Sequence, residues 1–194
     1  MKLVLVRHPT VAVELGVCYG ASDVELAPGW EDWCQEVASL AGAIQGRVAC
    51  AASPLSRCLH PARRIGFDVS PDLRLREMNF GDWEGRRWSD IAVEEIDRWN
   101  ADLMTRAPPG GESLGDMHAR ALDFLATARS LELDALVALT HGGPIRCMLT
   151  TLLGMPATQL FRLRVDMGSV STVTLDAGGD VLEFMNLRLQ PAPR

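Results

Sequence analysis

Short runs of apolar residues predict the strands of a buried sheet. Three such runs, at residues 2–6, 48–52 and 136–139, are bounded by charged or turn-forming residues. Runs this short and this uniformly apolar are typical of strands that are covered on both faces. Two further segments, 170–175 and 181–187, are joined around Gly178-Gly179 and predict a closing hairpin.

The segments between these strands carry apolar residues at helical spacing. The pair Ser53-Pro54 predicts the start of one helix, with Ser53 as the N-cap and Pro54 at the first helical position. The other predicted helices are residues 30–45, 89–104, 112–131 and the segment from Gly143 to about 153. Because strands alternate with helices, the pattern predicts an α/β fold with a largely parallel central sheet.

Length and charge narrow the class of protein. The chain has 194 residues, and its formal charge of −6 disfavours a general nucleic-acid binder, which usually has a basic face. The longest uninterrupted apolar run has five residues, and a transmembrane helix needs ~20. The N-terminus is charged too early for a secretory signal. We therefore expect one domain over residues 1–194, with no nucleic-acid or membrane partner. The oligomeric state stays open, and residues 190–194, with two prolines, are expected to form a loose tail.

The cysteines favour a reducing compartment. They number five, and no two have Cys-x-x-Cys spacing. An odd number without such pairs predicts free thiols in the cytoplasm and no zinc ribbon or disulfide framework. We accordingly expect a cytoplasmic protein.

Polar side chains with matching chemistry follow the three apolar runs. Arg7-His8, the segment Ser53 to Arg57, and His141-Gly142 each come directly after a predicted strand. Because ligands of parallel sheets bind beyond the carboxyl ends of the strands, we expect these residues to converge.

This set is suited to phosphoryl transfer. The guanidinium groups of Arg7 and Arg57 match phosphate oxygens, and a neutral imidazole is a nucleophile near pH 7. Gly142-Gly143 at a predicted helix start offers backbone N–H groups to an anion. A carboxylic acid must protonate the leaving oxygen, and Glu77 is the candidate. Asp82 and Glu84 are close rivals in sequence, and we expect Glu84 to support the loop instead.

The same residues lie in segments that resemble the histidine phosphatase superfamily, the phosphoglycerate mutase-like fold. Five segments carry the resemblance in the family's order: Leu5 to His8, Ser53 to Cys58, Leu75 to Gly85, Pro109 to Ser113 and Thr140 to Arg146. The resemblance implies a three-layer α/β/α sandwich. It implies that His8 is the phosphohistidine nucleophile and that Glu77 is the proton donor and then the base for water. It also implies that Arg7 and Arg57 hold the phosphoryl oxygens while His141 stabilises the transferring group.

The superfamily resemblance implies no metal or organic cofactor. Three segments narrow the resemblance: Arg7 to Pro9, Cys18 to Asp23 and Arg76 to Gly85. Within the superfamily, they look most like bacterial alpha-ribazole phosphatases. This likeness implies a small-molecule phosphate monoester as substrate, either alpha-ribazole 5′-phosphate or adenosylcobalamin 5′-phosphate in cobalamin assembly. Tyr19 and Ser22 lie in the loop that carries part of the likeness, and we expect them, with Gly142, to contact the substrate. For Tyr19, a packing role is an equal alternative.

The first motif departs from the family's usual Arg-His-Gly-Glu-Thr. Pro9 and Thr10 follow His8, and Glu14 stands where an asparagine is common. Because a carboxylate facing a phosphate would repel it, we expect Glu14 to point elsewhere or to contact another part of the substrate.

Other functions are considered beside the specific phosphatase. A broad-specificity phosphatase would use the same residues. A phosphoglycerate mutase would need extra segments to exclude water, which this chain lacks. An inactive phospho-ligand-binding domain is disfavoured by the intact set of Arg7, His8, Arg57, Glu77 and His141, and a metal hydrolase by the absence of His-x₃-His or Cys-x-x-Cys spacing.

Overall fold

A six-stranded sheet forms the centre of the molecule. The computed structural model describes residues 1–189, so the predicted tail at 190–194 lies outside the described residues. The strands are β1 (Lys2–Arg7), β2 (Val48–Ala52), β3 (Val69–Pro71), β4 (Ala135–Thr140), β5 (Ser169–Thr174) and β6 (Val181–Arg188). Their order is β3-β2-β4-β1-β5-β6, and β5 alone runs against the others. The predicted largely parallel sheet and the closing β5–β6 hairpin are therefore confirmed.

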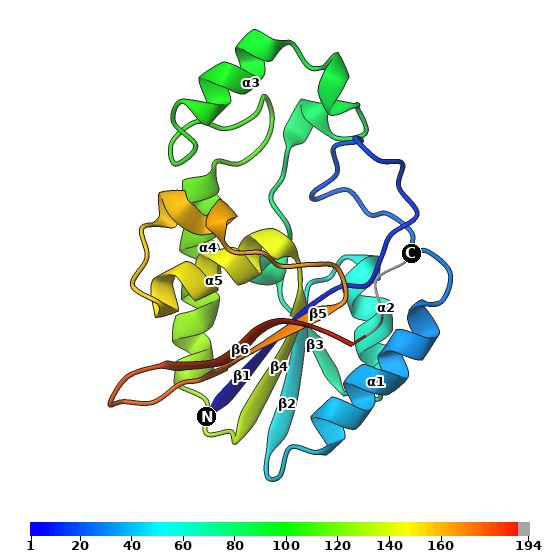
Figure 1. Ribbon diagram of the computed structural model, residues 1–194, viewed down its shortest axis with the longest axis vertical. Coiled ribbons are helices and arrows are strands. Elements are labelled where there is room, and N and C mark those ends of the chain that lie inside the picture. The colour runs from blue at the N-terminus through cyan, green and yellow to red at the C-terminus, as the bar shows by residue number, and fades with distance from the viewer. Residues whose placement is uncertain (190–194) are drawn as a thin grey trace.

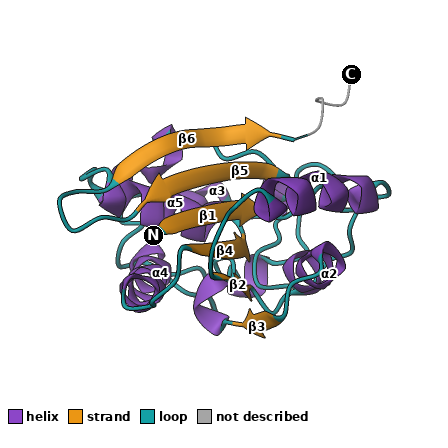
Figure 2. Cartoon of the chain, turned by 90° about the horizontal axis from the view of Figure 1, so that it is seen from below, coloured by secondary structure: helices purple, strands orange, loops and turns teal. Residues whose placement is uncertain are grey.

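Helices cover both faces of this sheet (Figures 1 and 2). The helices α1 (Trp30–Gly42) and α2 (Ser56–Ile65) lie on one face, and α4 (Leu114–Arg129) and α5 (Gly142–Leu152) lie on the other. Strand β1 serves both layers, since Leu3 and Leu5 belong to the core beneath α4 and α5, while Val4 and Val6 belong to the core beneath α1 and α2. This alternation explains why the strand is a continuous apolar run, and it confirms the three-layer sandwich.

A cap segment, which we define as residues 78–111, lies above the sheet edge where the parallel strands end (Figure 1). It holds one short helix, α3 (Val93–Asn100), and 3₁₀ turns at Gly81–Trp83 and Trp88–Asp90. Its own small core is aromatic, with Trp83 buried among Phe80, Trp88 and Trp99. The segment thus brings apolar side chains over the predicted site.

Three helix predictions need correction. The predicted helix at 89–104 is only α3, because a 3₁₀ turn precedes it and hydrogen-bonded turns follow it. The helix after Ser53-Pro54 begins at Ser56, with Leu55 at the N-cap and no side-chain cap. Ser53 does not cap it, because its hydroxyl pairs with His141 instead. Strand β3 and the 3₁₀ turns at Leu73–Leu75 and Ala157–Arg162 were not predicted.

The helices of the described part of the chain are all too short or too polar to cross a membrane.

Candidate active site

The strand register brings the predicted site residues together. Arg7 on β1 lies opposite Thr140 on β4, and the amide of His8 donates to the Thr140 carbonyl at 3.0 Å. On the other side of β4, the Ser53 amide donates to the Leu139 carbonyl at 2.9 Å. His8, Ser53 and His141 therefore leave three adjacent parallel strands at the same level, as the strand-end rule predicts.

His8 is held as a buried ring with one nitrogen free. Its side chain is 1% exposed, and Nδ1 lies 2.7 Å from the Pro9 carbonyl oxygen. Because a carbonyl only accepts, Nδ1 carries the proton, which leaves the Nε2 lone pair available. Burial, and then the charges of Arg7 and Arg57, lower the pKa of His8 well below its ordinary value. The neutral imidazole is thus the resident form.

His141 lies beside it, with its ring centroid 5.1 Å from that of His8 in an edge-to-face arrangement. Arg57 Nε donates to His141 Nδ1 at 3.2 Å, so Nε2 carries the proton and donates to Ser53 Oγ at 2.8 Å. Burial and the neighbouring Arg57 also lower the pKa of His141 well below its ordinary value. Ser53 is therefore a site residue that orients the second histidine.

Arg7 and Arg57 form a cationic centre without a counterion. Arg57 is completely buried and donates to the carbonyls of Ser22, at 2.7 Å, and Gly20. Arg7 Nη1 donates to the Val165 carbonyl at 2.6 Å, and its buried Nε has no partner among the described residues. Within residues 1–189, no carboxylate forms an ion pair with either arginine. Because their hydrogen-bond partners are carbonyls and, for Arg57, the neutral His141 ring, the two guanidiniums retain their full charge for an anion.

Two glycines allow this close approach at the start of α5. A Cβ on Gly142 would lie 2.8 Å from Arg146 Nη1 and 3.4 Å from Arg7 Cζ. A Cβ on Gly143 would lie 2.2 Å from Glu77 Oε1. Any other residue at either position would displace an arginine or the carboxylate, so Gly142 lines the site through its small size.

Glu77 is the carboxylate that lines the site. The Gly143 amide, in the first turn of α5, donates to both of its oxygens at 3.2 Å, and the Met78 amide donates to Oε1 at 3.1 Å. Glu77 also lines a cavity of about 370 Å³, together with Tyr19 and Gly143. The carboxylate is therefore held by backbone donors with its oxygens at the cavity wall.

The rival carboxylates are engaged elsewhere. Glu84 accepts from the amides of Ala21 at 2.8 Å and Phe80 at 3.0 Å, and from the amide and hydroxyl of Ser22. Burial raises the pKa of Glu84, but these hydrogen bonds outweigh it and hold the pKa below the ordinary range. Asp82 is exposed on the cap segment and is not among the residues that line the cavity. Glu84 thus ties the 18–22 loop to the cap segment, as expected.

The structure places the predicted residues Tyr19, Ser22 and Glu14 in three different environments. Tyr19 lines the cavity, and the Arg57 guanidinium lies 5.5 Å from its ring centroid, so it both packs and faces the site. Ser22 does not offer a free hydroxyl, because Glu84 binds it, and only its carbonyl serves Arg57. The predicted contact of Ser22 with substrate therefore stays a prediction, and in this structure its hydroxyl is bound to Glu84. Glu14 points away and pairs with exposed Arg87, as expected.

The cavity beside Glu77 is mostly apolar, and the sequence did not identify it. Its aromatic and aliphatic wall comes from the cap segment, α4 and the 3₁₀ turn at Ala157–Arg162, and includes Phe80, Trp88, Trp99, Leu103, Met117 and Phe161. One cation, Arg146, joins Tyr19 and Glu77 as the polar part of the lining. Arg146 stands at the end of the last motif, and that position was the one available signal for it. Among the described residues, no group of three His, Cys, Asp or Glu side chains is placed to hold a metal ion.

Known proteins are similar to this chain in sequence and in fold. A curated adenosylcobalamin/alpha-ribazole phosphatase of Salmonella typhimurium is 31% identical over 150 residues, which cover 73% of each chain. A protein described as a probable phosphoglycerate mutase of Shigella boydii is 32% identical over 163 residues, 79% of this chain and 75% of that one. The crystal structure of the alpha-ribazole phosphatase from Shigella flexneri superimposes with a TM-score of 0.87 at 25% identity, over 100% of both chains.

These similarities confirm the fold and the resemblance that the motifs indicated. The model of the histidine phosphatase superfamily (branch 1) matches residues 3–188, which include each of the strand ends described above. Since the match spans nearly all of the chain and its motif residues meet in one buried site, the chain belongs to the histidine phosphatase superfamily, branch 1.

Proposed function

We propose that this protein is a phosphomonoesterase that works through a phosphohistidine intermediate at His8. The observation that carries the proposal is a neutral His8 with Nε2 unpaired, next to the buried Arg57 and the half-buried Arg7, neither of which has a counterion within residues 1–189. A phosphate monoester supplies the missing negative charge, and phosphoryl transfer depends mainly on such positioning and charge neutralisation.

In the first step, Nε2 of His8 attacks phosphorus as the bond to the leaving oxygen breaks. Arg7 and Arg57 neutralise the phosphoryl oxygens, and His141 donates its Nε2 hydrogen to one of them once its ring turns from Ser53. Glu77 gives its proton to the leaving oxygen, so the product departs as an alcohol. The Gly143 amide, which now holds the Glu77 carboxylate, stabilises the carboxylate that this step creates.

In the second step, water attacks the phosphohistidine on the face that the alcohol has left. The Glu77 carboxylate takes the proton from the water while the N–P bond breaks. Inorganic phosphate leaves, His8 is neutral again, and Glu77 is protonated for the next cycle. Each group thus returns to its initial state without a metal or an organic cofactor.

The cavity supports a substrate with an apolar, planar leaving group. Its wall of Phe80, Trp88, Trp99 and Met117 adjoins Glu77, so the group attached to the leaving oxygen would enter it. Alpha-ribazole 5′-phosphate carries a dimethylbenzimidazole, which suits an aromatic wall. We therefore propose alpha-ribazole 5′-phosphate, or the corresponding cobalamin phosphate, as the substrate, in line with the two similar proteins that are described as alpha-ribazole phosphatases.

Phosphoglycerate mutase activity is the second candidate. It is favoured by the similarity to the Shigella boydii protein and by Arg146, which could bind a carboxylate. The apolar remainder of the cavity argues against it, since a small polar acid would leave that wall without a partner.

Phosphate release by the wild type, His8→Ala and His60→Ala tests the proposal. The panel is alpha-ribazole 5′-phosphate, other nucleoside monophosphates, 3-phosphoglycerate and an aryl phosphate. We expect His8→Ala to lose activity on the order of a thousandfold or more, because no other nucleophile replaces the imidazole. His60 is exposed on α2 and serves as the matched control with wild-type rates.

The pattern over the panel decides the substrate. Preference for alpha-ribazole 5′-phosphate supports the full proposal, and His8-dependent activity on the aryl phosphate alone retains the chemistry but removes this substrate. Interconversion of 2- and 3-phosphoglycerate would favour the mutase, and activity that persists in His8→Ala would refute the phosphohistidine mechanism.

A further inference from the structure

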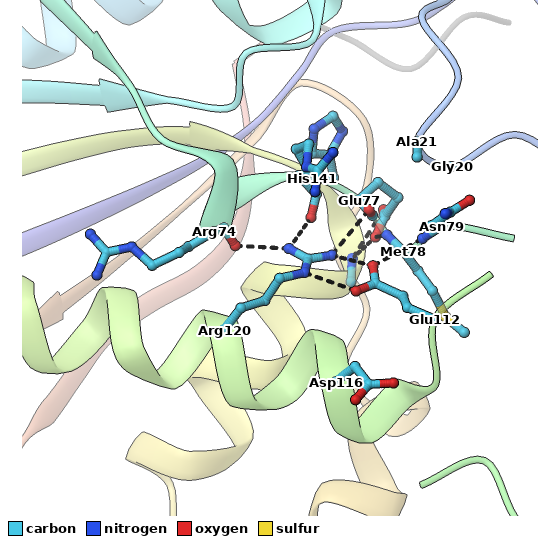
Figure 3. A network of polar contacts seen from close by, with 12 residues as sticks. Gly20, Ala21, Arg74, Glu77, Met78, Asn79, Glu112, Asp116, Arg120 and His141 are labelled. Carbon is cyan, nitrogen blue, oxygen red and sulfur yellow. Dashed lines mark hydrogen bonds and ion pairs between the residues drawn. The ribbon is translucent and has the colours of Figure 1, made fainter. Parts of the chain in front are cut away.

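A single arginine on α4 holds the backbone that carries Glu77. We refer to residues 74–79 as the acid-bearing segment. It has no strand partner, yet the carbonyls of residues 74 to 77 all accept hydrogen bonds. Arg120 binds three of them: Arg74 at 2.8 Å and Arg76 at 2.5 Å through Nη1, and Glu77 at 3.1 Å through Nη2. Figure 3 shows the guanidinium lying between α4 and this segment.

Glu112 completes the attachment from the residue before the N-cap of α4. Its carboxylate accepts from Arg120 Nε at 3.1 Å and Nη2 at 2.5 Å, and from the Asn79 amide at 2.9 Å. The five N–H groups of the guanidinium are thus all used, two on a carboxylate and three on carbonyls. The side chains are only 16% and 21% exposed, so solvent competes little for these bonds.

A second arginine runs in the opposite direction between the same elements. Arg74 extends from the acid-bearing segment to α4, where Nη1 donates to Asp123 Oδ2 and Thr127 Oγ1, both at 2.8 Å. This pair lies farther from Glu77, and Asp123 is largely exposed. Of the two arginines, Arg120 is therefore the one that acts on Glu77, since it binds the backbone carbonyl of Glu77 itself.

We propose that Arg120, oriented by Glu112, is a positioning residue that sets the place of the Glu77 carboxyl group for proton transfer. The inference rests on the proposed role of Glu77 as the proton donor. The Glu77 oxygens meet the Gly143 amide at 3.2 Å, a contact that a small shift of the backbone would break. Proton transfer is sensitive to such shifts, and a misplacement of about 1 Å can cost on the order of a hundredfold in rate.

The reaction offers a readout that separates positioning from simple stability. A poor leaving group, such as the primary alcohol of a nucleoside 5′-phosphate, needs its oxygen protonated, whereas 4-nitrophenolate leaves without help. Loss of the acid should therefore lower kcat/KM on the alkyl phosphate far more than on 4-nitrophenyl phosphate. A general loss of folded protein would lower both values equally.

The test compares kcat/KM on both substrates for Arg120→Lys, Glu112→Gln, Glu77→Gln and Arg129→Lys. Lysine keeps the charge but presents its donors from one nitrogen, so it cannot span three carbonyls and a carboxylate. For Arg120→Lys we expect a fall of about ten- to a hundredfold on the alkyl phosphate and of less than about threefold on 4-nitrophenyl phosphate. For Glu112→Gln we also expect kcat/KM to fall more on the alkyl phosphate than on 4-nitrophenyl phosphate. Arg129, at the other end of α4 in an ion pair with Asp180, is the matched control with wild-type values.

Each outcome has one meaning. If Glu77→Gln discriminates between the substrates but neither Arg120→Lys nor Glu112→Gln does, the positioning role is wrong and the proposed function stands. If Glu77→Gln does not discriminate, the proton-donor role itself is wrong. Equal losses on both substrates in Arg120→Lys, with a lowered Tm, would reduce the arginine to a structural tie. A change in the high-pH side of the kcat/KM profile of Arg120→Lys would support positioning if it accompanies a loss of kcat/KM on the alkyl phosphate alone.

Discussion

At the scale of single residues, the two histidines are neutral for related reasons but serve different partners. His8 donates a hydrogen bond from Nδ1 to a backbone carbonyl, whereas His141 accepts one at Nδ1 from Arg57. Both rings are buried next to arginines, which is why the pKa of each lies well below its ordinary value. The site thus stores positive charge on guanidiniums that cannot deprotonate and keeps the nucleophile uncharged.

This arrangement predicts how stability depends on pH. Below about pH 6.5 the unfolded chain binds protons at His8 and His141, while the native state does not. The free energy of unfolding should therefore fall as the pH is lowered from about 6.5 to 5. Each histidine contributes up to about 1.4 kcal/mol per pH unit. The carboxylates with lowered pKa values, such as Asp72 and Glu84, act only below this range.

Urea unfolding at pH 7.5 and 5.5 measures the effect. His8→Asn should show a shallower pH dependence than the wild type, since one of the two buried rings is gone. His60→Ala, which removes an exposed histidine, should keep the wild-type slope. A His8→Asn variant with an unchanged slope would show that His8 takes up protons in the native state.

At the scale of elements, α4 links packing to the site. Its apolar face packs in the core with Leu114, Met117 and Ala121, while Arg120 on the neighbouring face reaches the acid-bearing segment. Its start is defined by a capping box, in which Ser113 Oγ accepts from the Asp116 amide at 3.1 Å and the Asp116 carboxylate accepts from the Ser113 amide at 2.9 Å. The Ser-x-x-Asp spacing carries this information in the sequence.

Removal of this cap tests how firmly α4 is held. Ser113→Ala should lower the free energy of unfolding by about 1 kcal/mol, because the Asp116 amide in the first turn loses the Ser113 hydroxyl as its acceptor. Ser130, whose hydroxyl donates to the Thr127 carbonyl at the exposed end of α4, is the matched position. Ser130→Ala should cost clearly less, and equal midpoints for the two variants in urea would argue against the capping role.

At the scale of the whole molecule, the cap segment and the sandwich share contacts. Glu84 joins the cap segment to the 18–22 loop, and Asn79 joins it to Glu112 beside α4. The cavity wall also combines residues of the cap segment with Leu114 and Leu160 from the sandwich side. We accordingly propose that the chain unfolds as one unit, although the cap segment has an aromatic core of its own.

Two unfolding signals can check this expectation. Three of the five tryptophans, Trp83, Trp88 and Trp99, lie in the cap segment, so fluorescence reports mainly on it, while far-UV circular dichroism reports on the sandwich helices. The two transitions should coincide.

Leu5→Ala, at a fully buried position of β1, should shift both transitions together and lower the free energy of unfolding by about 2–5 kcal/mol. Leu15→Ala, at a side chain that is 95% exposed, should change neither, and a fluorescence transition that separates from the other would indicate an independent cap.

The sequence alone determined five of the six strands and the cluster at the edge of the sheet. Apolar runs such as residues 2–6 are local patterns, and burial on both faces leaves them few other structures. The topological rule for parallel sheets then placed Arg7-His8, Arg57 and His141 at one edge although they are far apart in the chain. The ends of helices were predicted less accurately. The helical spacing of apolar residues at 89–104 predicted one long helix, but a 3₁₀ turn and aromatic packing in the cap segment limit the helix to α3.

Only the tertiary structure decided which carboxylate faces the site and what holds it there. Glu77, Asp82 and Glu84 are chemically alike and close in sequence, and what surrounds each one separates their roles. The Gly143 amide binds Glu77, solvent surrounds Asp82, and Ser22 binds Glu84. The Ser53 hydroxyl serves His141 rather than its own helix, and Arg120 reaches a carbonyl 43 positions away. Such contacts depend on how distant segments pack, and because no local pattern of residues encodes that packing, they could not be predicted from it.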